Sequence, residues 1–438
     1  MHTPSRTESQ SWPGLLPAMA FLLAGGVLGF TEARTLSGQG LAFVEDPTRL
    51  LVYGGAYSWA LAWLIAHPKG VARLATAVWP WCVLLAYVLA SSLWSPFPLK
   101  VIVNFGHLAG GTLVAAAAVL AVQGDGGKLA GMVIFAFGLV LALSLAAVLA
   151  GVPNAFDLES GRWAGTTGNA NTLGSVAAIV CWAATYCLLT APRVIVKLSA
   201  TMVWVLGAVV LLGSGSATSL VVGVLMSGGT CWLLLGRKEN SSVVGRTLVG
   251  LALAAVSLAV AMTFAPELLG MEKVLQVLGR SATLSGRTEL WALGWDRFLE
   301  RPLAGYGFDS LAALLSGAAM QVGQLHNGYL DLLIQGGAIA GVLFVVLTAR
   351  SIRHAFVLAR RGRTESVMCL LFILGALAHN VTESSIARPV TNLWFLFVLA
   401  VLTLERHRSW RDAAAPVATH DHHLHRPARL APLPNLLR

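Results

Sequence analysis

Long apolar runs follow one another along almost the whole of this 438-residue chain. Each is about as long as the 20 or so residues that a membrane-spanning helix needs. Only 11% of the residues are charged, whereas soluble domains average about 25%. The runs are rich in Leu, Ala, Val and Gly, which is typical of packed helices rather than of alternating barrel strands. We therefore predict an all-α polytopic membrane protein with about twelve transmembrane helices, near residues 13–31, 48–66, 74–94, 101–122, 129–150, 171–190, 194–212, 217–235, 246–264, 326–349, 365–381 and 389–405.

The distribution of Lys and Arg predicts the orientation of these spans. With about twelve spans, both termini lie on one side of the membrane, and that side holds 20 of the 30 Lys and Arg residues. We therefore expect cytoplasmic termini, with the long interruption between 265 and 325 on the outer side. The net charge of +10 then reflects topology and attraction to anionic lipid, and it gives little support to nucleic-acid binding.

The runs divide the chain into five expected regions. A cytoplasmic N-terminus (1–12) precedes nine spans (13–264), which include an outward loop at 151–170. A large outward loop with amphipathic helices (265–325) separates these from three further spans (326–405). The basic tail (406–438) is rich in Ala, Pro and His, and we expect it to be disordered. The five cysteines all fall in expected spans without disulfide or metal spacing, and we find no internal repeat.

The outward loop before the sixth span carries the segment GRWAGTTGNANTLG, residues 161–174. Asn169 and Asn171 are N-cap candidates, because an amide oxygen can accept from the free N–H groups of a first helical turn. Arg162 beside such a helix start would make an anion-binding site. The alternative is a capped helix with an arginine at the membrane interface.

Two apolar stripes at helical spacing lie in the large outward loop. Arg280 ends the first and Arg287 begins the second, in a Ser-Gly-Arg turn whose Ser285 is a possible N-cap. For Arg280, Arg297 and Arg301 the sequence alone favours contact with lipid headgroups. Arg287 is the stronger functional candidate, because it lies in the turn between the two expected helices. The stripes are Leu268, Met271, Leu275 and Leu278, and then Trp291, Trp295, Phe298 and Leu299.

His326 opens the tenth expected span and is followed by Asn327, Tyr329 and Asp331. A histidine at the end of a span is often an interfacial residue or a cap. Histidine as a residue type also suits proton abstraction near neutral pH. The presence of Arg162 and Arg287 on the same expected side of the membrane favours this catalytic role.

We predict no metal site on the outward side. It has no HExxH, DxD or paired CxxC pattern, and its acidic residues are scattered. The His-rich stretch at 420–425 lies in the expected cytoplasmic tail, where a metal function has little support.

Together, several motifs resemble the O-antigen ligase/polymerase superfamily of bacterial envelope glycosyltransferases. They are RWAGTTGNANTLG, GSGSATS (213–219), the SGR turn followed by Trp291, PLAGYGFDS (302–310) and HNGYLDLLIQGG (326–337). The similarity covers roughly residues 80 to 400. In this order the motifs are fairly specific together, although each alone is weak.

The resemblance implies a GT-C-like enzyme that transfers a polysaccharide from undecaprenyl pyrophosphate to an acceptor hydroxyl with inversion. It implies an inner-membrane protein with a periplasmic active site that needs neither nucleotide nor metal. His326, Arg287 and Arg162 match the essential histidine and arginines of the family. The lower-ranked expectations for substrate binding are Arg280, Arg388, Asn169, Asn171, Asn327, Tyr329 and Glu383.

Three acceptors are open within the superfamily. They are lipid A-core for a ligase, a sugar repeat for a polymerase, and a protein side chain for an O-oligosaccharyltransferase. The short tail argues against the last. The polymerase pattern of arginine followed eleven positions later by glycine is absent, because Leu173 and Phe298 stand there. We therefore expect a ligase. A transporter is the non-enzymatic alternative, but only Asp331 lies well inside an expected span.

Overall fold

A computed structural model describes residues 12–28, 47–157, 160–236, 287–308, 311 and 324–412 of the chain. Within these ranges the ordered elements are helices. The extended backbone is limited there to one antiparallel bridge, between Phe156 and Trp163. The predicted all-α polytopic membrane class is therefore confirmed.

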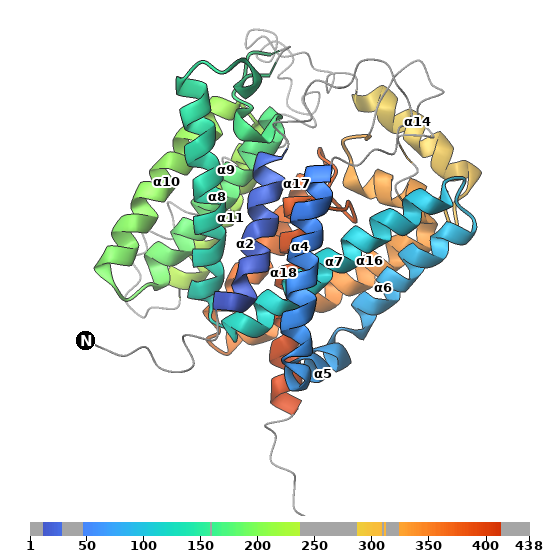
Figure 1. Ribbon diagram of the computed structural model, residues 1–438, viewed down its shortest axis with the longest axis horizontal. Helices are drawn as coiled ribbons and strands as arrows, with labels where there is room; N and C mark the ends of the chain where they lie inside the picture. Colours follow the sequence, from blue (N-terminus) through green and yellow to red (C-terminus); the bar gives the residue numbers. More distant parts are fainter. Residues whose placement is uncertain are drawn as a thin grey trace, which may run out of the picture.

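Every expected span that falls on described residues coincides with helix, whereas the run 246–264 lies outside the described residues. Figure 1 shows the arrangement of the longer helices. These are α2 (Trp12–Val27), α4 (Pro47–Ile65), α5 (Pro68–Ala77), α6 (Trp79–Ala90), α7 (Pro98–Val122), α8 (Gly126–Leu149), α9 (Ala170–Thr190), α10 (Val194–Ser214), α11 (Ala217–Leu235), α14 (Arg287–Glu300), α16 (Gly328–Arg360), α17 (Thr364–His379) and α18 (Asn392–Asp412).

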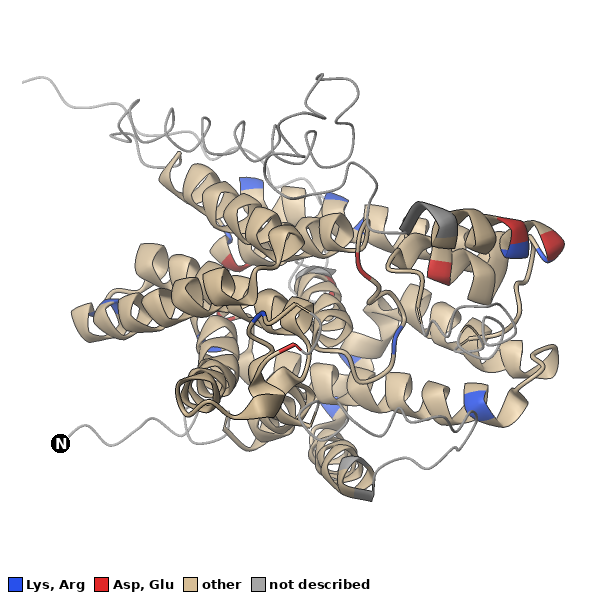
Figure 2. Ribbon diagram, turned by 90° about the horizontal axis from the view of Figure 1, so that it is seen from above, with Lys and Arg blue, Asp and Glu red and all other residues tan. Residues whose placement is uncertain are grey.

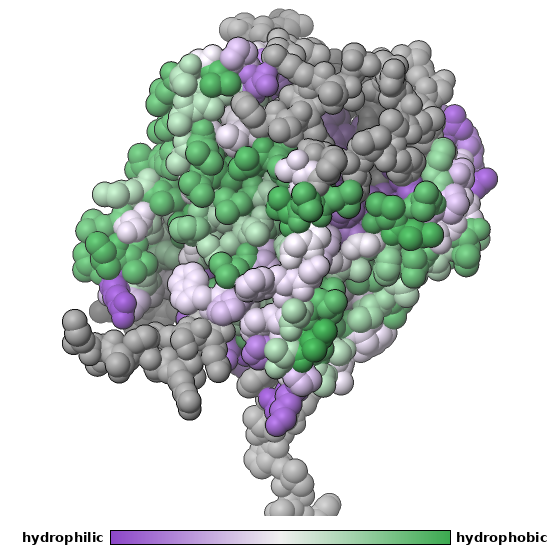
Figure 3. All heavy atoms as spheres, viewed as in Figure 1, coloured by the Kyte–Doolittle hydropathy of each residue, from purple (hydrophilic) through white to green (hydrophobic). Residues whose placement is uncertain are grey.

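Six of the described helices are long and apolar enough to cross a membrane: α7, α8, α9, α10, α11 and α16. A seventh span results if α4 and α5 count as one, although their axes differ by 102°. Helices α2 and α17 are apolar but shorter. The protein is thus a multi-pass membrane protein, and Figure 3 shows hydrophobic side chains over much of the flank of the bundle. The total of twelve spans stays a prediction.

The third expected span, 74–94, is wrong at its start. Residues up to Ala77 belong to α5, and the chain turns at Val78 before α6 begins at Trp79. Proline occupies the first turn of both α5 and α6, where its missing N–H costs no helical hydrogen bond. Hydropathy alone could not locate this turn, because the residues on both sides of it are apolar.

Helix α9 is enclosed by its neighbours in the bundle. Helix α9 packs against α8, α10 and α11, and the residues of its middle turns are buried on all sides. The start of α2 and the end of α18 lie at one end of the bundle. The α8–α9 connection and α14 lie at the other end, at the top of Figure 1, and this end is called the upper end below.

Helix α16 is broken at Gly337, where φ is 64° and ψ is −170°. The expected span at 326–349 falls on α16, which is a candidate span, but the break was not predicted: a short helix precedes it and a long one continues to Arg360. The PLAGYGF segment, residues 302–308, hydrogen-bonds to both sides of the break. Tyr306 N and Gly307 N donate to the carbonyls of Ile334 and Gln335, and Ala338 N and Ile339 N donate to those of Pro302 and Leu303. This segment thus replaces the helical hydrogen bonds that the break removes.

Replacement of Gly337 by Ala is expected to destabilise the protein by at least about 2 kcal/mol. A Cβ atom at this residue would lie 2.1 Å from the carbonyl oxygen of Leu303, in a backbone conformation that only glycine adopts readily. Thermal unfolding in detergent measures the effect. Gly131→Ala is the matched control, because a Cβ atom there meets nothing within 4 Å. Equal melting temperatures for the two variants would contradict the proposed role of the break.

Candidate active site

A cavity of about 520 Å³ lies at the upper end of the bundle. It is bounded by the first turn of α9, the segment that precedes α16, and the connection between α17 and α18, with α2 and α4 on the remaining side. Figure 2 shows the molecule from above. The helices carry few charged residues, whereas several charged residues lie on the connecting segments near the middle of the view. The cavity therefore joins three segments that lie far apart in the sequence.

Arg162 is held beside the first turn of α9. Its Nε donates to Ser160 Oγ at 3.0 Å, and its Nη1 donates to Asn171 Oδ1 at 3.2 Å. Asn169 is the N-cap predicted from the sequence, since its side chain accepts from the backbone N–H groups of Asn171 and Thr172. Asn171 is not a cap, because its amide connects Arg162 to another segment. Two of the five guanidinium N–H groups are thus engaged, and they fix the position of the arginine.

The Ser-rich turn GSGSATS supports Arg162 from behind. A Cβ atom on Gly215 would lie 2.9 Å from Arg162 Cδ, and one on Gly213 would overlap the ring of Trp163. Ser216 caps α11 by accepting from the N–H of Ser219. Because only glycine leaves this space, the stem of the arginine can pack against the turn between α10 and α11.

His326 lies in the turn before α16, with φ at 51°. Asn327 caps the helix by accepting from Tyr329 N and Leu330 N, each at 3.1 Å. The neighbouring Leu325 is fixed from two sides, because its N–H donates to Asp331 Oδ1 and its carbonyl accepts from Trp291 Nε1 of α14. These contacts hold the turn in its left-handed conformation and present the imidazole to the cavity.

Glu383 links the two motifs. Its Oε2 lies 3.2 Å from His326 Nδ1, and its Oε1 accepts from Asn171 Nδ2 at 2.9 Å. Glu383 is 9% exposed, and its backbone carbonyl accepts from Gly328 N. A continuous chain of side chains therefore runs from Arg162 through Asn171 and Glu383 to His326.

Two hydrogen-bond contacts of His326 bear on which ring nitrogen carries the proton, and both are made by Nδ1. Nδ1 also lies 3.4 Å from Gln324 Nε2, which can only donate, whereas the carboxylate of Glu383 can only accept. The shorter, charge-assisted contact with Glu383 favours a proton on Nδ1. Nε2 then has its lone pair available, as a general base requires.

Arg388 places a cation at the wall of the cavity. Its guanidinium donates to Gln324 Oε1, and both residues line the cavity. The first turn of α9 lines the same cavity, and the positive end of a helix dipole favours anions. The cavity therefore combines a histidine base with groups that stabilise negative charge.

Arg287 begins α14, and its side chain lies outside the described part of the structure, as does all of Arg280. The second expected stripe is confirmed as helix α14, whereas the first stripe and Ser285 fall outside the described residues. Helix α14 packs on the first part of α16 through Leu290, Trp291 and Leu325. Arg287 thus lies one helical turn before the residue that contacts Leu325.

The last residue of α14, Glu300, is hydrogen-bonded to two side chains. Tyr306 donates to the carboxylate of Glu300, and Arg297 does so at 3.0 Å. The hydrogen bonds from Tyr306 and Arg297 lower the pKa of Glu300. Burial, followed by the contact with Glu300, raises the pKa of Tyr306. The pair keeps α14 attached to the PLAGYGF segment.

Tyr329 and Asn327, two of the lower-ranked expectations for substrate binding, have structural contacts. Tyr329 donates its hydroxyl to the carbonyl of Leu377 at 2.7 Å, and Asn327 uses its side chain as the cap of α16. Neither residue lines the cavity. Both therefore fix the helix that carries His326 rather than contact the cavity. The sequence interpretation did not include Gln324 and Ser160. The sequence indicates them only by position, because each lies two residues before a predicted site residue, His326 or Arg162.

No group of three His, Cys, Asp or Glu side chains in the described ranges could hold a metal ion. The absence of metal and cofactor from the reaction remains a prediction, and the His-rich stretch at 420–425 is outside these ranges.

Comparison with known proteins gives an independent view of this site. The O-Antigen ligase family model matches residues 200–345, which include the Ser-rich turn, Arg287 and His326. The chain is also 27% identical over 271 residues to the Exopolysaccharide production protein ExoQ of Rhizobium meliloti (strain 1021). That alignment covers 57% of this chain and 53% of ExoQ, so the chain matches about half the length of this relative.

Members of this family are glycosyltransferase-like enzymes. Arg162, Asn171, Glu383 and Arg388 lie outside the matched segment, yet the structure brings the first three to His326 through hydrogen bonds. The resemblance seen in the sequence motifs is confirmed: residues 200–345 of this multi-pass membrane protein form a domain of the O-antigen ligase family.

Proposed function

We propose that this protein is an O-antigen ligase with a GT-C-like fold, which transfers a polysaccharide from undecaprenyl pyrophosphate to a hydroxyl of lipid A-core in lipopolysaccharide assembly. The observation that carries the proposal is the side-chain chain Arg162–Asn171–Glu383–His326, in which Asn171, Glu383 and His326 line the cavity and Arg162 is hydrogen-bonded to Asn171. This chain connects His326, which can accept a proton, to Arg162, which can stabilise a negative charge. Glycosyl transfer from a pyrophosphate needs both functions.

His326 is the proposed general base. The acceptor hydroxyl gives its proton to Nε2, and its oxygen attacks the anomeric carbon of the glycan from the face opposite the pyrophosphate. The bond between this carbon and the phosphate oxygen breaks, and its electron pair leaves with the pyrophosphate, so the configuration inverts. Glu383 stabilises the imidazolium that forms, because its carboxylate accepts from Nδ1.

Arg162 is the proposed partner of the leaving pyrophosphate, with Arg287 and Arg388 as further cations. Undecaprenyl pyrophosphate gains negative charge as the glycosidic bond breaks, and fixed guanidinium groups can neutralise it without a metal ion. The N–H groups at the start of α9 add partial positive charge in the same place. Asn169 and Asn171 support this arrangement, and Arg280 remains a proposed helper.

The proposed location is the bacterial inner membrane, with cytoplasmic termini and the cavity facing the periplasm. The Lys and Arg distribution of the sequence supports this orientation. The start of α2 and the end of α18 share one end of the bundle, and the cavity lies at the other end. A lipid-linked donor in the outer leaflet would then reach the cavity directly.

A polymerase is the second proposed function. It is favoured by the similarity to ExoQ, which is described as an exopolysaccharide production protein. In this case the acceptor would be another lipid-linked glycan, and the roles of His326 and Arg162 would be the same. Transfer to a protein side chain and transport without transfer are the remaining alternatives, and the following test separates all four.

Reconstitution of the purified protein with undecaprenyl-pyrophosphate-linked glycan and lipid A-core, in the presence of EDTA, tests the proposal. A ligase produces lipid A-core that carries the glycan. Elongation of the lipid-linked glycan alone would indicate a polymerase, and glycosylation of an added acceptor protein would indicate an oligosaccharyltransferase. Movement of the donor between leaflets without any transfer would refute the enzymatic proposal.

Glu383→Gln is expected to reduce the rate of transfer about 10- to 100-fold, because a neutral amide no longer holds Nδ1 protonated or stabilises the imidazolium. The rate should fall more in kcat than in KM, and its dependence on pH should shift. Thr382→Val, at the neighbouring residue whose hydroxyl contacts Thr218 at 2.8 Å, is the control. If the pH dependence of the transfer rate were unchanged in Glu383→Gln, Glu383 would have only a structural role.

A further inference from the structure

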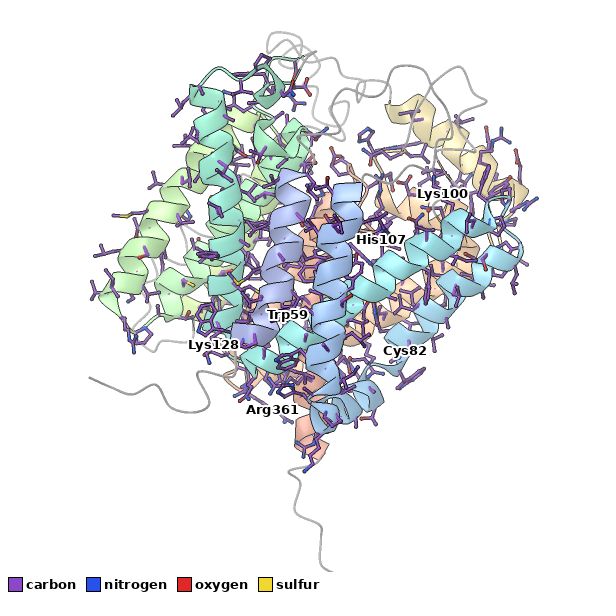
Figure 4. All side chains as sticks on the ribbon, viewed as in Figure 1. Trp59, Cys82, Lys100, His107, Lys128 and Arg361 are labelled. Carbon is purple, nitrogen blue, oxygen red and sulfur yellow. The ribbon has the colours of Figure 1, made fainter. Side chains whose placement is uncertain are left out.

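Helix α7 carries a polar face in its upper half. Lys100, Asn104 and His107 follow one another at spacings of four and three residues, which places them on one side of the helix over about 10 Å. Asn104 is buried, and Lys100 and His107 are partly buried. Figure 4 shows Lys100 and His107 on the upper half of α7, and Lys128 at the opposite end of the bundle.

This face continues to the cavity through two tyrosines of α4. His107 Nδ1 lies 3.0 Å from the hydroxyl of Tyr57, and the ring of His107 meets that of Tyr53 edge-on at 6.3 Å. Tyr53 is 3% exposed and lines the cavity. A row of polar side chains, called the polar path below, therefore leads from Lys100 on the flank of the bundle to Tyr53 at the cavity.

The charge of this path is positive. Residues 47–124, which include α4, α5, α6 and α7, contain no Asp or Glu. Polar and cationic groups in a membrane-spanning helix are costly and tend to mark substrate pathways. Lys100 and His107 lie on α7, whereas Arg162 is held at the first turn of α9. The polar path therefore reaches the cavity from α4 at Tyr53, whereas Arg162 lies beside the first turn of α9 and is hydrogen-bonded to Asn171 of that turn.

We propose that Lys100, Asn104 and His107, with Tyr57, form a binding subsite for the second substrate, a lipid-anchored glycan acceptor that carries phosphate. This inference rests on the proposed function and names the place at which the acceptor approaches. Lysine binds phosphate as a point charge. The side chains of Asn104, His107 and Tyr57 supply donors and acceptors for sugar hydroxyls. The acceptor hydroxyl would reach His326 past Tyr53, while the donor pyrophosphate lies against Arg162.

Direct binding of fluorescent lipid A-core to the full-length protein in detergent tests this subsite without the need for turnover. Lys100→Gln is expected to weaken binding of phosphorylated lipid A-core about tenfold. It should have little effect on lipid A-core from which a phosphatase has removed the phosphate groups. The same measurement with undecaprenyl-pyrophosphate-linked glycan, in which the phosphates join the lipid to the sugar, shows whether Lys100 binds lipid A-core or the undecaprenyl pyrophosphate.

Lys128→Gln is the matched control, because Lys128 is exposed at the opposite end of the bundle. Lys100→Arg should retain binding, and His107→Gln should weaken it for both forms of the acceptor. Equal loss of affinity for the two forms in Lys100→Gln, or loss for the donor instead, would overturn the proposal. A protein that binds acceptor as described but transfers nothing would refute the proposed function and leave this subsite standing.

Discussion

His326→Ala is expected to reduce glycan transfer by a factor of about 10²–10⁴, the range typical of loss of a general base. The physical reason is that Nε2 has its lone pair directed away from Glu383, and no other group of the chain Arg162–Asn171–Glu383–His326 can take its place. The measurement is the single-turnover rate of transfer in reconstituted vesicles. Binding of the donor should remain within a few-fold of that of the wild type.

A second variant separates loss of the base from loss of the turn. Residue 326 has a φ of 51°, which asparagine tolerates better than alanine. His326→Asn should therefore retain the melting temperature of the wild type and lose activity like His326→Ala. His67→Gln, at the junction of α4 and α5, serves as the histidine control. Transfer at more than half of the wild-type rate in His326→Asn would exclude the base role.

Arg162→Ala is the second change with a large expected effect, a decrease of about 10²–10³ in kcat. Removal of the guanidinium leaves the developing charge on the pyrophosphate without its fixed partner. Arg162→Lys retains the charge but not the fork that contacts Ser160 and Asn171 at once, and it should recover only part of the rate. The kcat and the KM for the donor, measured separately, show whether the loss occurs in the transition state.

Arg193→Ala provides the control for the arginine, because Arg193 is exposed at the start of α10 in the other half of the bundle. Its activity should equal that of the wild type. A rise in the donor KM at unchanged kcat in Arg162→Ala would assign the arginine to ground-state binding. Unchanged values for both would remove Arg162 from the proposed active site.

The helices of the bundle were predictable because their signal is local. Each expected span on described residues is helical, Asn169 is the cap of α9, and α14 follows the stripe that begins at Trp291. Apolar periodicity and capping act within one or two turns of the chain, so the sequence contains them directly. The break at Gly337 was missed because the run around it is mostly apolar and because PLAGYGF, more than 25 residues earlier, satisfies the backbone there.

The sequence by itself determined that this chain is a helical membrane protein whose residues 200–345 match the O-antigen ligase family, and it singled out Arg162 and His326. Only the tertiary structure decided how these residues are connected. Asn171 and Glu383 are 212 residues apart, and Glu383 and His326 are 57 apart. Hydrogen bonds depend on distances of about 3 Å in space, and packing of α9, α16 and α17 sets those distances. The same packing turned Tyr329 towards Leu377 and made Glu383 the centre of the site.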